Sequence, residues 1–129
     1  MGVRGVTRRI LIIDDHPAVR QSLRAILESQ ADFLVCGEAE NGQLGIEKAR
    51  QLRPDAIILD ISMPVLNGLE AAKILKSILP GVPIVMFTSF VHDRLSDLAA
   101  AAGANAVISK VASSDALVRT LEGLLNRSA

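Results

Sequence analysis

Five residues that can support metal or nucleophilic chemistry stand at the ends of short apolar runs in this sequence. They are Asp14 and Asp15 after residues 10–13, Asp60 after residues 56–59, Thr88 after residues 83–87, and Lys110 just beyond residues 106–108. Apolar runs of this length are typical of strands buried on both faces of a parallel sheet. Because ligand chemistry gathers at the carboxyl ends of such strands, we expect the five side chains to meet at one sheet edge.

Three carboxylates at one edge need charge compensation. Two carboxylates about 4 Å apart repel by roughly 4 kcal/mol at an effective dielectric near 20, whereas a net hydrogen bond returns only about 1 kcal/mol. The cluster therefore needs a raised pKa, a cation such as Lys110, or a divalent metal, and hard oxygen ligands favour Mg²⁺. A metal and a lysine make a phosphate pocket, in which the Asp60 carboxylate is the favoured nucleophile for phosphoryl transfer.

Each of these residues also has a simpler explanation when it is taken alone. Asp60 fits an aspartate that caps a turn before Pro64, the pair at 14–15 fits helix-capping acids, and Thr88 fits a capping hydroxyl. Lys110 fits a solvated charge near a strand end. The coincidence of all five at the ends of successive strands favours a common site.

The segments between these runs are predicted to be helices, because apolar residues recur in them at helical spacing. The predicted helices begin near Pro17, after Asn41-Gly42, at Leu69, at His92 and after Ser113-Ser114-Asp115. Residues 33–39 supply one further strand. Alternating strands and helices of this length indicate a three-layer α/β domain, with a parallel sheet covered on both faces by right-handed crossovers.

Composition narrows the class of protein. The chain has 129 residues, half of them hydrophobic, and 14 basic residues balance 14 acidic ones, so a single domain over 1–129 without direct nucleic-acid binding is expected. Its one cysteine, Cys36, argues against a disulfide framework or a zinc site. The apolar run after the basic residues Arg8-Arg9 is too short for a signal peptide or membrane span, so we expect a cytoplasmic protein.

With these motifs, the chain resembles the receiver domains of two-component response regulators, most closely the NarL/LuxR-type branch. The resemblance implies a flavodoxin-like (βα)₅ fold with the strand order 2-1-3-4-5, a short N-terminal extension over residues 1–8, and no output domain in this chain. The residues that carry it are Asp14-Asp15-His16-Pro17, Gly37-Glu38-Ala39 with Asn41-Gly42, Asp60-Ile61-Ser62-Met63-Pro64, and Gly68-Leu69-Glu70-Ala71.

The resemblance also implies a role for each residue of the predicted site. Asp60 accepts a phosphoryl group from a sensor histidine kinase or a phosphotransfer protein. Mg²⁺ binds Asp15, Asp60 and the backbone carbonyl of Ser62, with Asp14 acting mainly through water. Thr88 and Lys110 grip the phosphoryl oxygens, and the face around the fourth helix and fifth strand is remodelled and can form a homodimer.

Two positions depart from this family pattern, Val107 and Val111. Val111 follows Lys110 where many members have proline, so a cis peptide bond that would help to fix the lysine is not expected. Val107 occupies the place of the aromatic residue that usually swings inward with the threonine, so the usual aromatic switch cannot operate. Phe90 and Ser62, each two residues beyond a site residue, border the path of the hydrolytic water in the family, and we hypothesise that the bulky Phe90 slows dephosphorylation. His16 is predicted to be a first-turn helix residue rather than a metal ligand.

The predicted function is that of a phosphorylation-switched binding module, not of an enzyme that turns over an external metabolite. One alternative is a phosphohydrolase of the haloacid dehalogenase type, but those enzymes carry a second acid two residues after the nucleophile, where this chain has Ser62. The other alternative, suggested by Val107, is a receiver-like scaffold that phosphate does not switch.

Overall fold

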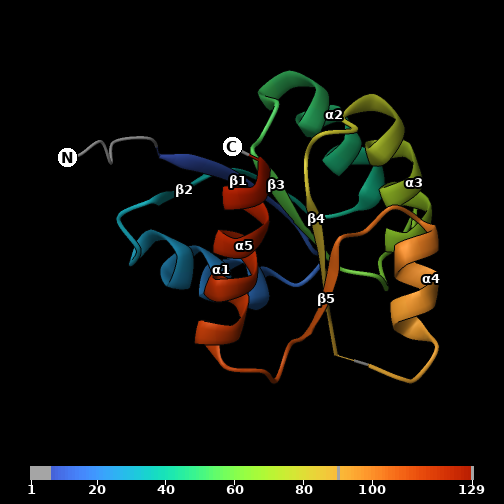
Figure 1. Ribbon diagram of the computed structural model, residues 1–129. Helices are drawn as coiled ribbons and strands as arrows, with labels where there is room; N and C mark the ends of the chain where they lie inside the picture. Colours follow the sequence, from blue (N-terminus) through green and yellow to red (C-terminus); the bar gives the residue numbers. More distant parts are fainter. Residues whose placement is uncertain (1–6, 90, 129) are drawn as a thin grey trace.

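The computed structural model describes residues 7–89 and 91–128, in which strands and helices alternate along the whole chain (Figure 1). In order, the elements are β1 (Arg8–Ile13), α1 (Pro17–Glu28), β2 (Phe33–Ala39), α2 (Gly42–Leu52), β3 (Ala56–Leu59), α3 (Gly68–Ile78), β4 (Ile84–Thr88), α4 (Leu95–Ala101), β5 (Ala106–Ser109) and α5 (Ser114–Ser128).

The strands form one parallel sheet in the order β2-β1-β3-β4-β5, which confirms the predicted fold class and strand order. β3 lies at the centre, where Ile57 pairs with Leu11 of β1 and with Ile84 of β4. All four residues of β3 are buried, as are Ile10 to Ile13 of β1. Burial on both faces explains why these strands are continuous apolar runs and not alternating ones.

The sheet separates two hydrophobic cores, because successive strand side chains point to opposite faces. In β3, Ile57 and Leu59 belong to the core beneath α2, α3 and α4, whereas Ala56 and Ile58 belong to the core beneath α1 and α5. Figure 1 shows α1 and α5 together on one side of the sheet and α3 and α4 on the other. The predicted three layers are therefore present.

The helix boundaries follow local sequence signals, with one clear difference from prediction. Pro17 is the first residue of α1, and the side chains of Asn41 and Asn67 cap α2 and α3 by accepting backbone N–H bonds. The helix predicted from His92 begins only at Leu95, whose N–H donates to the His92 carbonyl (3.0 Å). Arg94, the residue before α4, makes no side-chain capping bond, so nothing local extends that helix towards His92.

Candidate functional site

The backbone of the site is held by hydrogen bonds that continue the sheet just past the strand ends. The Asp14 N–H donates to the Ala39 carbonyl (3.0 Å), and the Asp60 N–H donates to the Ile13 carbonyl (2.9 Å). The Lys110 N–H donates in the same way to the Thr88 carbonyl (2.8 Å). The parallel sheet therefore brings residues from four strands to one edge, as the sequence predicted.

At this edge Lys110 makes ion pairs with two acids. Its Nζ lies 2.9 Å from Asp14 Oδ2 and 3.4 Å from Asp60 Oδ2. The side chains of Asp14 and Asp60 are 2% and 3% exposed, so both carboxylates are withdrawn from water, while Asp15 is 29% exposed. The ammonium group of Lys110 is thus the main positive charge that lies close to the two buried carboxylates of Asp14 and Asp60.

The electrostatics of Asp60 reflect this crowding. Burial of the carboxyl, together with the nearby Asp14 carboxylate, raises the pKa of Asp60 above its ordinary value, and the Lys110 ammonium opposes that rise. The net direction is upward, so Lys110 alone does not compensate the cluster. An additional cation at this site would stabilise the ionised form of Asp60.

The other predicted site residues are placed as follows. Thr88 is the last residue of β4 and is buried, and Ser62 is exposed in the loop two residues after Asp60. Val107 is half-buried in β5 and lines an open groove of about 210 Å³ against small residues of α4, including Ala99 and Ala100. Phe90 lies outside the described residues.

Two residues at the site were not given their roles by the sequence prediction. His16 precedes α1 as its N-terminal cap, not within the first turn, and its Nδ1 lies 3.0 Å from Asp14 Oδ1 and 3.0 Å from Asp15 Oδ1. Arg20 Nη1 donates to the Asp14 carbonyl (2.6 Å), and its Nε donates to Glu38 (3.0 Å). Arg20 therefore ties α1 and β2 to the backbone of the acid pair.

Gly68 is required where α3 approaches the backbone of Asp60. A Cβ atom at Gly68 would lie 2.1 Å from the Asp60 carbonyl oxygen and 2.6 Å from Ile61 Cα, and both of these are backbone atoms that cannot move aside cheaply. The Gly68 N–H also donates to the Ile61 carbonyl (2.7 Å). The first residue of α3 thus rests directly against the loop that carries Asp60.

We expect Gly68→Ala to destabilise the protein by about 2 kcal/mol, the usual size of an overpacking effect. Urea unfolding followed by circular dichroism measures this difference. Gly123→Ala in α5 is the matched control, because a Cβ at that position meets nothing within 4 Å and alanine favours the helix. Equal stability changes in the two variants would contradict the close contact at Gly68.

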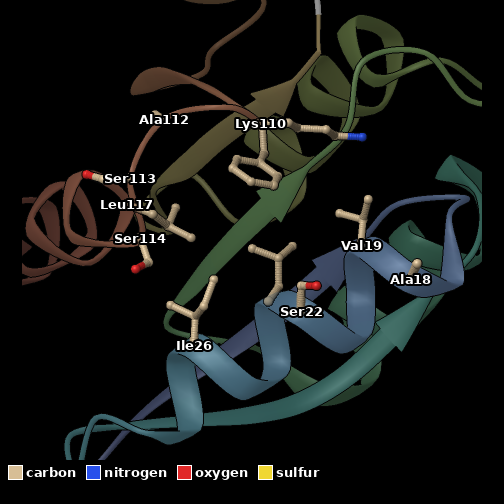
Figure 2. Close-up of a pocket in the computed structure, with 11 residues that line it drawn as sticks. Ala18, Val19, Ser22, Ile26, Lys110, Ala112, Ser113, Ser114 and Leu117 are labelled. Carbon is tan, nitrogen blue, oxygen red and sulfur yellow. The ribbon is translucent and has the colours of Figure 1, made fainter.

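A separate cavity of about 260 Å³ lies beside the acid cluster, between α1 and the start of α5. Its walls are mainly apolar, with Leu23, Ile26 and Leu117 among the lining residues. Figure 2 shows the ammonium end of Lys110 pointing away from Ser113 and Ser114 of this cavity. None of the three acids lines it, whereas Lys110 does, so the cavity adjoins the charged site without including the acids.

The donor set of the acid cluster fits a divalent metal ion. One ligand atom from each of Asp14, Asp15, His16 and Asp60 can be chosen so that all lie within 4.8 Å of one another. Asp15 Oδ1 and Asp60 Oδ2 are buried and accept no hydrogen bond from any residue that the structure describes. Unsatisfied buried carboxylate oxygens are what a hard cation coordinates, so this cluster can bind a metal ion.

The doubly wound fold, with an acid cluster and a lysine at the carboxyl edge of its sheet, defines a receiver domain. Residues 10–122 match the family description "Response regulator receiver domain", and the chain belongs to this family. It is therefore a receiver domain of a two-component response regulator, a signalling domain whose acidic pocket fits a phosphoacceptor site.

Relatives of known class agree with this assignment. The chain is 38% identical over 113 residues to the transcriptional regulatory protein LnrK of Bacillus subtilis, covering 88% of this chain and 51% of LnrK. It is 36% identical over 122 residues to the response regulator protein VraR of Staphylococcus aureus, covering 92% of this chain and 58% of VraR. The chain thus spans about half the length of these relatives.

Solved structures show the same fold. The response regulator domain of Thermotoga maritima CheB superposes with a TM-score of 0.86 at 32% identity, covering 93% of this chain and 97% of that one. A LuxR-family response regulator from Aurantimonas sp. SI85-9A1 gives a TM-score of 0.89 at 28% identity, covering 93% of this chain and 86% of that one. Within the described residues, no helix has the length and apolar character needed to cross a membrane.

Proposed function

We propose that Asp60 accepts a phosphoryl group from a sensor histidine kinase or phosphotransfer protein, and that the acylphosphate switches a protein-interaction face. The observation that carries this proposal is the placement of Asp60: its carboxylate is 3% exposed and lies 3.4 Å from the Lys110 ammonium. A buried aspartate beside two further carboxylates and one lysine is suited to hold a phosphoryl group together with a metal ion.

In the proposed reaction, an Asp60 carboxylate oxygen forms a bond to phosphorus while the bond from phosphorus to the partner's imidazole nitrogen breaks. The electron pair of the broken bond stays on that nitrogen, and the ring leaves as neutral imidazole because its other nitrogen carries a proton. Lys110 neutralises charge on the phosphoryl oxygens, and the Thr88 hydroxyl at the end of β4 donates to one of them. Burial of the site keeps competing water away from the reacting atoms.

Mg²⁺ is the metal we propose for this reaction, held by Asp14, Asp15, Asp60 and the backbone carbonyl of Ser62. Support comes from the buried carboxylate oxygens without hydrogen-bond donors and from the raised pKa of Asp60, which burial and the Asp14 carboxylate cause. When bound, Mg²⁺ supplies the positive charge that the cluster lacks and a template for phosphoryl oxygens.

We propose that the output face lies around α4 and β5, where it can form a homodimer in the phosphorylated state. Thr88 ends β4, and the chain leads from it to α4, so a hydroxyl drawn towards phosphate shifts the start of that connection. Val107 is too small to act as the usual aromatic switch, and the groove beside it is lined by small α4 residues. The shift must therefore act through the backbone between Thr88 and α4.

Incubation with Mg²⁺ and acetyl phosphate tests the proposed function. We expect one phosphoryl group per chain by intact mass, lost in Asp60→Asn and retained in Asp55→Asn, a change at the opposite end of β3. Many turnovers of acetyl phosphate without an accumulated adduct would instead indicate a hydrolase. No adduct with acetyl phosphate or beryllofluoride would indicate a scaffold that phosphate does not switch.

Phe90 is proposed to lengthen the life of the acylphosphate, and Ser62 is the second position expected to tune it. We expect Phe90→Ala to lose phosphate several-fold faster, because a smaller side chain admits the hydrolytic water. Decay of the adduct after removal of acetyl phosphate measures this rate. Val91→Ala serves as the neighbouring control, and a Phe90→Ala decay no faster than the parent's refutes the role of Phe90.

A further inference from the structure

His16 adds a nitrogen atom to a cluster that otherwise offers oxygen. Its Nδ1 lies 3.0 Å from Asp14 Oδ1, 3.0 Å from Asp15 Oδ1 and 3.9 Å from Asp60 Oδ2. The His16 side chain is 60% exposed, so this nitrogen faces the acids while the rest of the ring remains open to solvent. An ion can therefore reach the cluster beside the ring.

Asp15 and Asp60 each have a buried carboxylate oxygen that accepts no hydrogen bond from the described residues. Asp60 is 3% exposed, and its Oδ2 accepts no hydrogen bond from the described residues, although Lys110 Nζ is 3.4 Å away. Asp14 directs Oδ2 towards Lys110 at 2.9 Å, and its Oδ1 accepts the His16 backbone N–H (2.9 Å) and faces His16 Nδ1. With Lys110 countering one of the three carboxylates, a divalent ion bound by a neutral imidazole makes the whole cluster neutral.

We propose that this pocket binds Zn²⁺ through His16 Nδ1 and one oxygen each of Asp14, Asp15 and Asp60, and that the bound zinc prevents phosphorylation of Asp60. Zinc accepts imidazole nitrogen and carboxylate oxygen, so the lack of a second cysteine does not exclude it. The second part of the proposal rests on the proposed phosphoacceptor function of Asp60.

The spacing of the donor atoms supports a tetrahedral ion. Zinc bonds to nitrogen and oxygen of about 2.0 Å place neighbouring ligand atoms about 3.3 Å apart at tetrahedral angles. The distances from His16 Nδ1 to the three carboxylate oxygens, 3.0, 3.0 and 3.9 Å, bracket that value. All four donor atoms lie within 4.8 Å of one another, so zinc binding has to draw the carboxylate oxygens closer together.

Zinc and magnesium differ in the coordination positions that they leave free for a phosphoryl oxygen. A four-coordinate zinc with four protein ligands has no position for a phosphoryl oxygen, and it occupies the Asp60 oxygen that must attack phosphorus. Mg²⁺ prefers oxygen ligands in an octahedral set and retains water positions that phosphate oxygens can take. Imidazole also favours zinc over magnesium, so His16 selects between an inhibited and a competent pocket.

Zinc binding by the intact chain tests the proposal directly. X-ray absorption at the zinc edge should show one imidazole ligand in the parent and no imidazole ligand in His16→Asn. Calorimetry should show that zinc affinity falls at least about ten-fold in His16→Asn. This is the lower limit of the affinity loss usually caused by removing a residue that supports a metal site. Mg²⁺ affinity should stay within about two-fold. His92→Asn is the matched control, since the chain has only these two histidines.

The phosphorylation assay separates this inference from the proposed function. One equivalent of Zn²⁺ should block the acetyl phosphate adduct in the parent but not in His16→Asn, and a chelator should restore it. Equal zinc affinity in the parent and His16→Asn, or a zinc spectrum without imidazole, would overturn the inference while the Mg²⁺-dependent adduct stands. Absence of that adduct without zinc would instead overturn the proposed function.

Discussion

Replacing Lys110 with methionine is expected to destabilise the protein by about 3 kcal/mol at neutral pH, because removing one partner of a buried ion pair leaves its charge uncompensated. Lys110 lies 2.9 Å from Asp14 and 3.4 Å from Asp60, and its side chain is only 11% exposed. Methionine keeps the apolar stem and removes only the ammonium group. Urea unfolding followed by circular dichroism measures the loss, since the chain contains no tryptophan.

The loss in Lys110→Met should shrink in acid. Without the ammonium group the pKa of Asp60, already raised by burial and by Asp14, rises further in the folded state. Between about pH 3.8, the ordinary aspartate pKa, and the raised pKa of Asp60, the folded variant binds more protons than the unfolded chain. The stability of the variant therefore falls as the pH rises through this range. A deficit that does not depend on pH would mean that lost packing, not charge, is the cause.

The same substitution is expected to slow formation of the acetyl phosphate adduct by about 100-fold, the usual effect of removing one preorganised group that stabilises transition-state charge. Lys73→Met, on the exposed face of α3, is the control for both measurements and should change stability by less than about 0.5 kcal/mol. An unchanged rate in Lys110→Met would exclude contact between Lys110 and the phosphoryl group.

Replacing Asp60 with asparagine is expected to abolish the adduct and also to stabilise the fold by on the order of 1 kcal/mol at neutral pH, because Lys110 offsets only part of the repulsion from Asp14. The sign follows from the raised pKa of Asp60, whose main causes are burial and Asp14. A carboxyl with a raised folded pKa costs stability when it ionises, and asparagine does not ionise.

Thermal unfolding at several pH values tests the effect of Asp60→Asn. The advantage of the variant should be full above the raised pKa of Asp60 and should vanish below about 3.8, where the carboxyl is protonated in both folded and unfolded chains. Asp97→Asn, an exposed acid on α4, is the control. An Asp60→Asn variant less stable than the parent at neutral pH would show that Lys110 more than compensates the cluster.

Much of this architecture could be predicted because the central strands are buried on both faces. The runs at 10–13 and 56–59 are apolar throughout for that reason, and parallel topology then brings Asp14, Asp60 and Lys110 to one edge. The order of the strands cannot be predicted in this way, because the periodicity of a strand–helix unit is the same whichever strand lies beside it. The order came from the family resemblance and was confirmed by the sheet.

The position of His16 could not be predicted from local signals. Pro17 indicated where α1 starts, and the two acids nearest the His16 ring, Asp14 and Asp15, are its sequence neighbours. The approach of the ring to Asp60, 44 positions further along the chain and 3.9 Å away, exists only in the fold. Arg20 has the same character, since its partners are the Asp14 carbonyl and Glu38 of β2. Side chains that act across elements need the tertiary structure.

The two cores separated by the sheet give this domain a modular evolutionary character. No buried side chain among the described residues belongs to both cores. Sites more than about 10 Å apart that share no partners have nearly additive effects on stability, so well-separated substitutions beneath α1 and α5 and beneath α3 and α4 should combine with little epistasis. One face of the molecule can thus diversify over generations while the other stays unchanged, provided that the acids and lysine at their common edge are kept.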